Sequence, residues 1–175
     1  MKTKFNDFVN ESIDSEYFKI RDKLKELNEE YQRILLETYD IQKDELNPIL
    51  SKIIDSNNID LINSVIEYTP KGLSISSYQF LYQKIYKLQQ NPVSKSDIKN
   101  YNIPFDKLDK VFLKIKEQNK LLEKIEDESE ILIDKIIKTN DLNIMRLFID
   151  VVQNLPNYKF FKKINQLRGK DDDED

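Results

Sequence analysis

Apolar residues recur at alternating spacings of four and three along the first quarter of the chain. This spacing places its members on one face of an α-helix and is typical of helices that pack along a seam. The stripe therefore predicts one long helix over residues 11–42. Its members are Ile13, Tyr17, Ile20, Leu24, Leu27, Tyr31, Ile34, Thr38 and Ile41.

The same spacing returns after residues 91–104, a stretch with two prolines that is interpreted as a linker. No segment alternates with period two over a useful length, so nothing indicates a strand. The sequence predicts an all-α fold, a helical bundle or array with two long heptad-patterned helices. The second stripe consists of Leu108, Val111, Ile115, Gln118, Leu122, Ile125, Ser129, Leu132 and Ile136.

Helix breaks in the first half are marked by Pro, Asn and Gly. Asn47-Pro48 is interpreted as an N-cap followed by a first-turn proline, which opens a second helix. The polar run 55–58 then breaks that helix, and residues 59–68 start another. Thr69 to Gly72 predicts a turn, followed by an aromatic-rich helix over 77–90.

The second half repeats this order. We expect Asn140 to cap a helix over 141–152, and Pro156 to open the last helix, which ends near Leu167. When the halves are aligned, Asp22-Lys23-Leu24 falls on Asp106-Lys107-Leu108, and Asn57 falls on Asn140 after one deletion.

The agreement favours an internal duplication. The alternative is chance matching, because Lys, Ile, Asn and Leu are common in this chain. The predicted organisation is an N-terminal segment at 1–11, a first repeat at 12–90, a linker at 91–104, a second repeat at 105–170 and an acidic tail at 171–175.

Composition excludes most catalytic sites. The chain has no His and no Cys, so it cannot form a disulfide, a zinc site with His or Cys ligands, or a Ser-His-Asp triad. Its two glycines are too few for a phosphate-binding loop. Carboxylate-only chemistry remains, but the acidic run 126–130 is better explained as a solvated linker between two helices than as a cation site. We expect no enzyme activity, no metal and no cofactor.

The N-terminus carries the most specific motif. Phe5-Asn6-Asp7-Phe8-Val9-Asn10-Glu11, preceded by Met1-Lys2-Thr3, resembles the start of internal head proteins of T-even-type and related tailed phages. The resemblance implies that this segment targets the protein to the prohead core. It also implies that the prohead protease cuts after Glu11 of the aliphatic-x-Glu triplet. The sequence departs from the pattern by the extra Lys4 and by Val9 in place of Ile or Leu.

The resemblance makes Phe5, Phe8, Val9 and Glu11 the candidate targeting and cleavage residues. The alternative is that the apolar ones dock onto the helical body and anchor the end of the chain. Six seam positions are candidates for an interaction between copies, although the core of the chain's own bundle is the favoured interpretation. They are Tyr17, Leu24, Tyr31, Leu108, Ile115 and Leu122.

The basic segment 159–170 has Phe160 and Phe161 interleaved, a composition that also suits nucleic acid. The five acids that follow would neutralise it, so we expect an amphipathic last helix with Phe160, Phe161 and Ile164 facing the core. Nucleic acid is therefore a disfavoured partner.

The sequence favours a non-enzymatic interaction or structural protein of a tailed phage, associated with the virion or prohead. The alternative is an accessory protein that binds a host protein in the bacterial cytoplasm, and a carboxylate-only enzyme is a distant third. The expected partner is a capsid, prohead or host protein, and self-association stays open. Because the chain has neither an apolar run of membrane-spanning length nor a signal-peptide core, we expect no membrane insertion and no secretion.

Overall fold

The structure, a computed structural model, describes residues 2–73 and 75–171, with side chains described for 15–73 and 75–169. All regular elements of these residues are helical, which confirms the all-α prediction. The chain divides into two compact units. Unit 1 contains residues 1–34 and 121–175, and unit 2 contains residues 35–120.

Two long helices, α1 (Lys2–Ile41) and α5 (Phe105–Lys138), each contribute to both units. The compact units therefore do not coincide with the sequence halves 12–90 and 105–170. Each apolar cluster includes residues of both α1 and α5, which come from different sequence halves, and the division into two repeats stays a prediction.

The predicted stripes are the inward faces of the long helices. On α1 the buried members are Ile20, Leu24, Leu27, Ile34 and Thr38, while Tyr17, Tyr31 and Ile41 are half-buried. On α5 the buried members are Leu108, Val111, Ile115, Ile125, Ser129 and Ile136, while Gln118, Leu122 and Leu132 are half-buried.

In unit 2 the two long helices run antiparallel. Lys114 Nζ lies 2.6 Å from Glu45 Oε1, and Gln118 Nε2 donates to Glu37 Oε2 at 3.4 Å. From the first pair to the second, the residue number rises on α5 and falls on the α1–η1 segment, so the two helices run in opposite directions. In unit 1 the Tyr31 hydroxyl on α1 donates to Glu126 Oε1 on α5 at 3.0 Å.

The chain leaves α1 through a π-helical turn, η1 (Gln42–Leu46), and enters α2 (Asn47–Asp55) without a break. Asn47 is therefore not an N-cap: its backbone is helical and its N–H donates to Gln42 O. Pro48 has no backbone N–H to donate, and its ring would clash with the preceding turn of a regular α-helix. The wider π turn leaves room for the ring, so the helix continues. The Asn47 side chain instead accepts a hydrogen bond from Ser77 Oγ at 2.7 Å.

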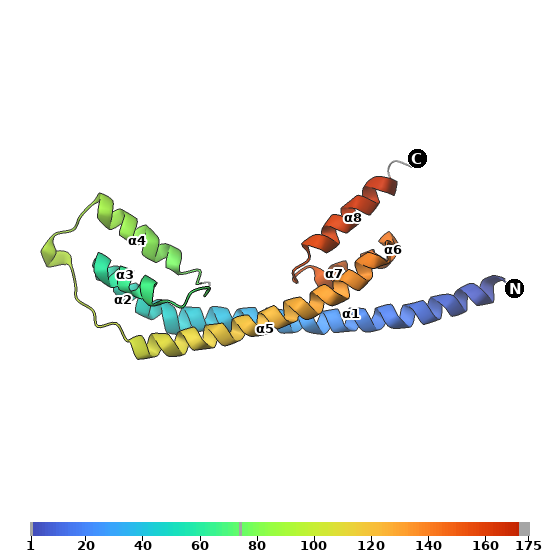
Figure 1. Cartoon of the computed structure of the whole chain (residues 1–175), viewed down its shortest axis with the longest axis horizontal. Helices are drawn as coiled ribbons and strands as arrows, with labels where there is room; N and C mark the ends of the chain where they lie inside the picture. The colour runs from blue at the N-terminus through green and yellow to red at the C-terminus, as the bar shows by residue number, and fades with distance from the viewer. Residues whose placement is uncertain (1, 74, 172–175) are drawn as a thin grey trace. The chain divides into compact units, whose positions relative to one another are not determined.

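Unit 2 is completed by α3 (Ile59–Tyr68), α4 (Tyr78–Gln90) and a short 3-10 turn, η2 (Lys95–Asp97) (Figure 1). The predicted turn before α4 is present, with Gly72 at φ 83. The buried side chains of this unit form one apolar cluster around Leu46, Ile53, Ile62, Leu81, Leu108 and Ile115.

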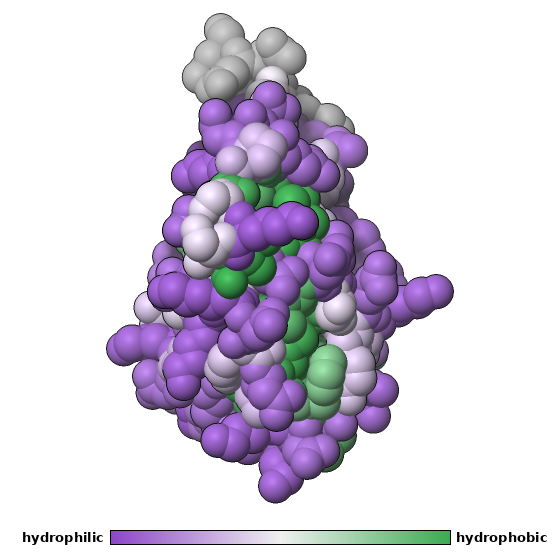
Figure 2. Space-filling view, turned by 90° about the vertical axis from the view of Figure 1, so that its left-hand side faces the viewer, coloured by the Kyte–Doolittle hydropathy of each residue, from purple (hydrophilic) through white to green (hydrophobic). Residues whose placement is uncertain are grey.

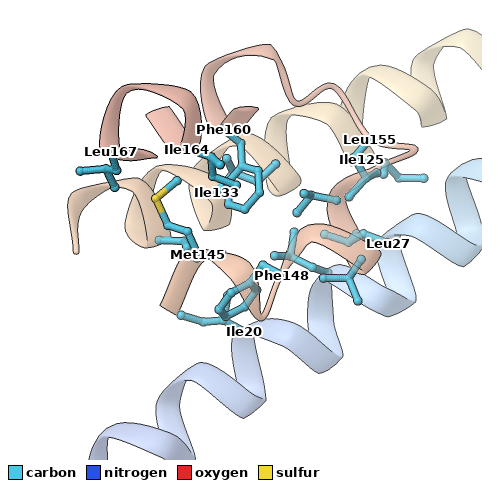
Figure 3. Packing of buried hydrophobic residues seen from close by; sticks show 14 of the residues in the cluster. Ile20, Leu27, Ile125, Ile133, Met145, Phe148, Leu155, Phe160, Ile164 and Leu167 are labelled. Carbon is cyan, nitrogen blue, oxygen red and sulfur yellow. The ribbon is translucent and has the colours of Figure 1, made fainter. Parts of the chain in front are cut away.

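Unit 1 adds α6 (Leu142–Arg146), α7 (Ile149–Val152) and α8 (Tyr158–Asp171) to the long helices. The single helix predicted over 141–152 is broken at Phe148, which is completely buried. Figure 3 shows Phe148 beside Ile20 of α1, and Phe160 and Ile164 of α8 near Ile133 of α5. Phe148, at this break, has its ring in the core. Pro156 lies two residues before α8 and is not part of it.

The two short turns that follow α2 and α5 share one backbone conformation. Asn57 and Asn140 have φ values of 54° and 53°. The hydroxyl before each donates to the carbonyl three residues earlier: Ser56 to Ile53 at 2.6 Å and Thr139 to Ile136 at 2.7 Å. A left-handed residue therefore ends the helix in each case.

The residue after each asparagine is the N-cap of the next helix. The Asn58 side chain accepts from the N–H groups of Asp60 and Leu61 at 3.1 and 3.2 Å. The Asp141 side chain accepts from those of Asn143 and Ile144 at 2.8 and 3.2 Å. The cap predicted at Asn140 is thus one residue too early, because a cap needs an extended backbone and Asn140 is left-handed.

The acidic run 126–130 lies inside α5 and is not the predicted linker. Ser129 is buried and its hydroxyl donates to Glu126 O at 2.9 Å, so the helix continues through the run with one face inward. Among residues with described side chains, no group of acids is arranged to hold a metal ion.

Candidate functional site

Unit 1 carries a groove of about 600 Å³ between the first described turns of α1 and the α6–α7 segment. Its lining is mostly apolar and comes from two stretches far apart in the sequence. The lining residues are Tyr17, Phe18, Arg21, Ile144, Arg146, Leu147, Phe148, Ile149, Asp150 and Gln153.

Two large apolar side chains stand exposed at this groove. Phe18 is 61 % exposed and Leu147 is 58 % exposed. Clustered exposed apolar side chains beside polar ones mark interaction surfaces more often than isolated ones do. The groove can therefore accept an apolar side chain and remove it from water.

The floor of the groove is set by packing. Tyr17 meets Phe148 edge-on, with ring centroids 6.4 Å apart and planes at 78°. Phe148 is held in the core with Ile20 and neighbouring apolar residues. Because close-packed interiors leave little room to shift, the position of the floor is defined by the core beneath it.

Arg21 of α1 bonds to the α6–α7 segment across the groove. Its Nη2 lies 2.6 Å from Asp150 Oδ2, and its Nε donates to the carbonyl of Leu147 at 3.0 Å. Both charged side chains are partly exposed, so the ion pair contributes about 0–1 kcal/mol to stability. Its larger effect is geometric, since the bond to the carbonyl holds Leu147 at the rim.

Arg146 supplies a second positive charge to the groove. Its guanidinium makes one long hydrogen bond, 3.5 Å from Nη1 to Asn143 Oδ1. No carboxylate of the described residues lies within 4.0 Å of it. The groove thus combines an apolar body with a cation available to an incoming acid.

The candidate targeting residues Phe5, Phe8, Val9 and Glu11 lie on the first turns of α1, outside the residues whose side chains are described. The acidic tail beyond Asp171 is also outside the described residues.

The six seam candidates pack inside the chain's own units. Tyr17, Leu24, Tyr31 and Leu122 belong to the unit 1 cluster, and Leu108 and Ile115 belong to the unit 2 cluster. Leu24, Leu108 and Ile115 are buried, whereas Tyr17, Tyr31 and Leu122 are half-buried, and use of the seam between copies stays a prediction. Tyr17 alone also lines the groove.

The last helix has the orientation expected from the sequence. Phe160 and Ile164 are buried, and Phe161 is half-buried against the same cluster. Phe160 and Phe161 pack edge-on at 5.5 Å. Lys159 forms an ion pair with Glu130 of α5, so part of this basic segment has a partner within the chain.

Sequence reasoning missed Phe18 and Leu147. Phe18 lies off the buried stripe of α1, Leu147 lies between α6 and α7, and the two are 129 positions apart (147 − 18). In the described part of the chain, no helix is long and apolar enough to cross a membrane. Comparison with known proteins finds no matching family model, curated protein or solved structure.

Proposed function

We propose that this protein is a non-enzymatic interaction protein of a tailed phage that is packaged with the prohead. The N-terminal segment 1–11 directs it there and is removed after Glu11. The sequence of residues 1–12, which resembles the start of internal head proteins, supports this assignment.

Cleavage after Glu11 would fall within α1, which begins at Lys2. The described members of the two apolar clusters begin at Tyr17. A chain that starts at Ser12 therefore retains all of these described members and every lining residue of the unit 1 groove. The processed chain is expected to stay folded.

The groove carries the interaction role. Phe18 and Leu147 both line this groove and are exposed, which leaves apolar surface in water that contact with a partner would bury. The chemistry of the lining fits a partner segment with an apolar side chain near a carboxylate, because Arg146 has no acidic partner in the described residues. The exposed apolar side chains of this groove support the interaction role.

The first experiment is the intact mass of the protein recovered from purified particles and from infected cells. We expect a particle-borne form that begins at Ser12. A Glu11→Gln variant should remain full length, at 20.9 kDa, because the protease loses the acid at its cleavage point. A full-length protein found only in cells contradicts packaging and supports a host-directed binder.

The groove is tested separately by Leu147→Asp, with Leu113→Asp as the matched control. Both leucines are similarly exposed, at 58 % and 57 %, but only Leu147 lines the groove. We expect Leu147→Asp to reduce the copies per particle and Leu113→Asp to leave them unchanged. Equal loss in the two variants would show that the groove has no special role.

A further inference from the structure

Unit 2 carries a second groove, of about 410 Å³, between α2 and the start of α5. Four lysines line it: Lys52 from α2 and Lys107, Lys110 and Lys114 from α5. We call this surface the lysine groove. Figure 2, seen from the side where α4 and the start of α5 lie in Figure 1, shows apolar side chains among hydrophilic ones on that face.

The charge of the lysine groove is unbalanced. The chain as a whole is acidic, with a net charge of −4, yet one carboxylate, Glu45, lines this groove. Glu45 pairs with Lys114. None of Lys52, Lys107 and Lys110 has a carboxylate within 4.0 Å among the residues that the structure describes.

Two features hold positive charge at this place. Lys52 Nζ lies 5.8 Å from the centre of the Tyr101 ring, a cation–π contact that keeps the ammonium over the groove. The N-terminus of α5, at Phe105, adds the partial positive charge of a long helix. Like charges gathered without counter-ions repel, so an anionic ligand gains free energy by binding here.

The lysine spacing suits an extended acidic peptide. Lys107, Lys110 and Lys114 lie on one face of α5, with axial steps of about 4.5 and 6 Å at 1.5 Å per residue. In an extended chain, side chains on one side repeat about every 6.6 Å. Two alternate carboxylates of an acid-only segment can therefore reach Lys107 and Lys110 with their flexible side chains, while the apolar side chains of Ile49 and Val111 line the same groove.

We infer that the lysine groove binds the acidic C-terminal segment 171–175 of a second copy of this chain. This segment is the longest uninterrupted run of acids in the sequence, five in five residues. Its first residue, Asp171, ends α8, and a helix C-terminus carries a partial negative charge, so a carboxylate there gains more from cations elsewhere than from its own helix end. Exposed ion pairs are individually weak, so the contact forms where many copies are concentrated.

The inference is independent of the groove on unit 1 and of packaging, and it is tested on the full chain. Isotope-labelled and unlabelled protein are mixed and treated with a carbodiimide, which joins a carboxylate to a lysine amine with loss of water. Mass spectrometry should find labelled-to-unlabelled links from residues 171–175 to Lys107 or Lys110. These links should fall several-fold in about 1 M salt, where the Debye length is about 3 Å.

The test variant is Lys107→Ala with Lys110→Ala, and the control is Lys116→Ala with Lys120→Ala. All four lysines are exposed on α5, and the control pair does not line the groove. We expect the test pair to remove most labelled-to-unlabelled links and the control pair to leave them. Links only within one copy, links mainly to Lys162 or Lys163, or equal loss in both variants would each overturn the inference.

Discussion

Asn57 and Asn140 hold the same left-handed backbone conformation at the same place in two turns, 83 residues apart (140 − 57). The hydrogen bonds around them correspond one by one, from the hydroxyl before each asparagine to the capping side chain after it. Left-handed conformations are costly for residues with a Cβ, and Asn tolerates them better than most. The shared turn supports an internal duplication, which we propose as the origin of the two halves.

The left-handed asparagines lead to the first prediction. Asn140→Ala should destabilise the protein by about 1 kcal/mol, because alanine pays the full steric cost of positive φ, whereas Asn140→Gly should be close to neutral. Asn57→Gly should cost more than Asn140→Gly, since Asn57 Nδ2 also donates to Asp97 O at 3.2 Å. Urea unfolding followed by circular dichroism measures these differences. Equal stability of Asn140→Ala and the unaltered chain would contradict the argument.

The second prediction concerns the helix caps. Asn58→Ala and Asp141→Ala each remove the acceptor of two backbone N–H groups and should cost about 1 kcal/mol. Hydrogen exchange should quicken at the first turns of α3 and α6, respectively. Asn102→Ala, at an exposed position outside any helix, is the control and should change neither stability nor exchange. Equal changes in stability and in hydrogen exchange in all three variants would contradict the capping roles of Asn58 and Asp141.

The third prediction separates the floor of the unit 1 groove from its rim. Phe148→Ala should destabilise the protein by about 3–5 kcal/mol, because the ring is completely buried and its removal leaves a cavity. The neighbouring Leu147→Ala should change stability by less than about 0.5 kcal/mol, since Leu147 is mostly exposed. Denaturant midpoints of both variants test the contrast. Similar losses in the two would mean that Leu147 supports the fold as well as the rim.

The fourth prediction concerns alkaline pH. Burial, together with the hydrogen bond to Glu126, raises the pKa of Tyr31 above its ordinary value of 10.0, and burial raises the pKa of Tyr78. The folded chain then holds these protons at a pH where the unfolded chain has lost them. Their contribution to stability is therefore complete below about pH 10 and is lost as the pH rises through the folded-state values.

Tyr31→Phe and Tyr78→Phe should each reduce the loss of stability between about pH 9 and pH 11. Tyr158→Phe serves as the control because that side chain is largely exposed. The unfolding free energy at the two pH values provides the measurement, with ultraviolet absorbance reporting tyrosinate. A larger effect from Tyr158→Phe than from the other two would refute the assignment.

Local pattern was enough to predict several elements. The four-three spacing predicts which side of α1 is buried, because only one face of a helix can be withdrawn from water. The breaks at 55–58 and at Thr69 to Gly72 follow from side chains that compete with helical hydrogen bonds or tolerate positive φ. These features depend on neighbours in sequence, so they can be deduced from the sequence itself.

Other features depend on packing between distant segments. The helix continues past Pro48 because a π turn forms there, and the break at Phe148 places that ring in the core. A local rule favours an N-cap in the first case and an unbroken helix in the second. Such local preferences amount to about 1 kcal/mol for most residues and about 3 kcal/mol for a proline inside a helix, so the burial of a few large apolar side chains can outweigh them.

The sequence by itself determined the helical class, the buried seam and the asparagine-marked turns, since each follows from bonding and burial within a few residues. Only the tertiary structure decided the units and the two grooves. Phe18 and Leu147 line one groove, and Lys52 and Lys107 line the other, through the packing of separate segments. Such pairings follow from the summed burial of many side chains, which the spacing of residues along one helix does not specify.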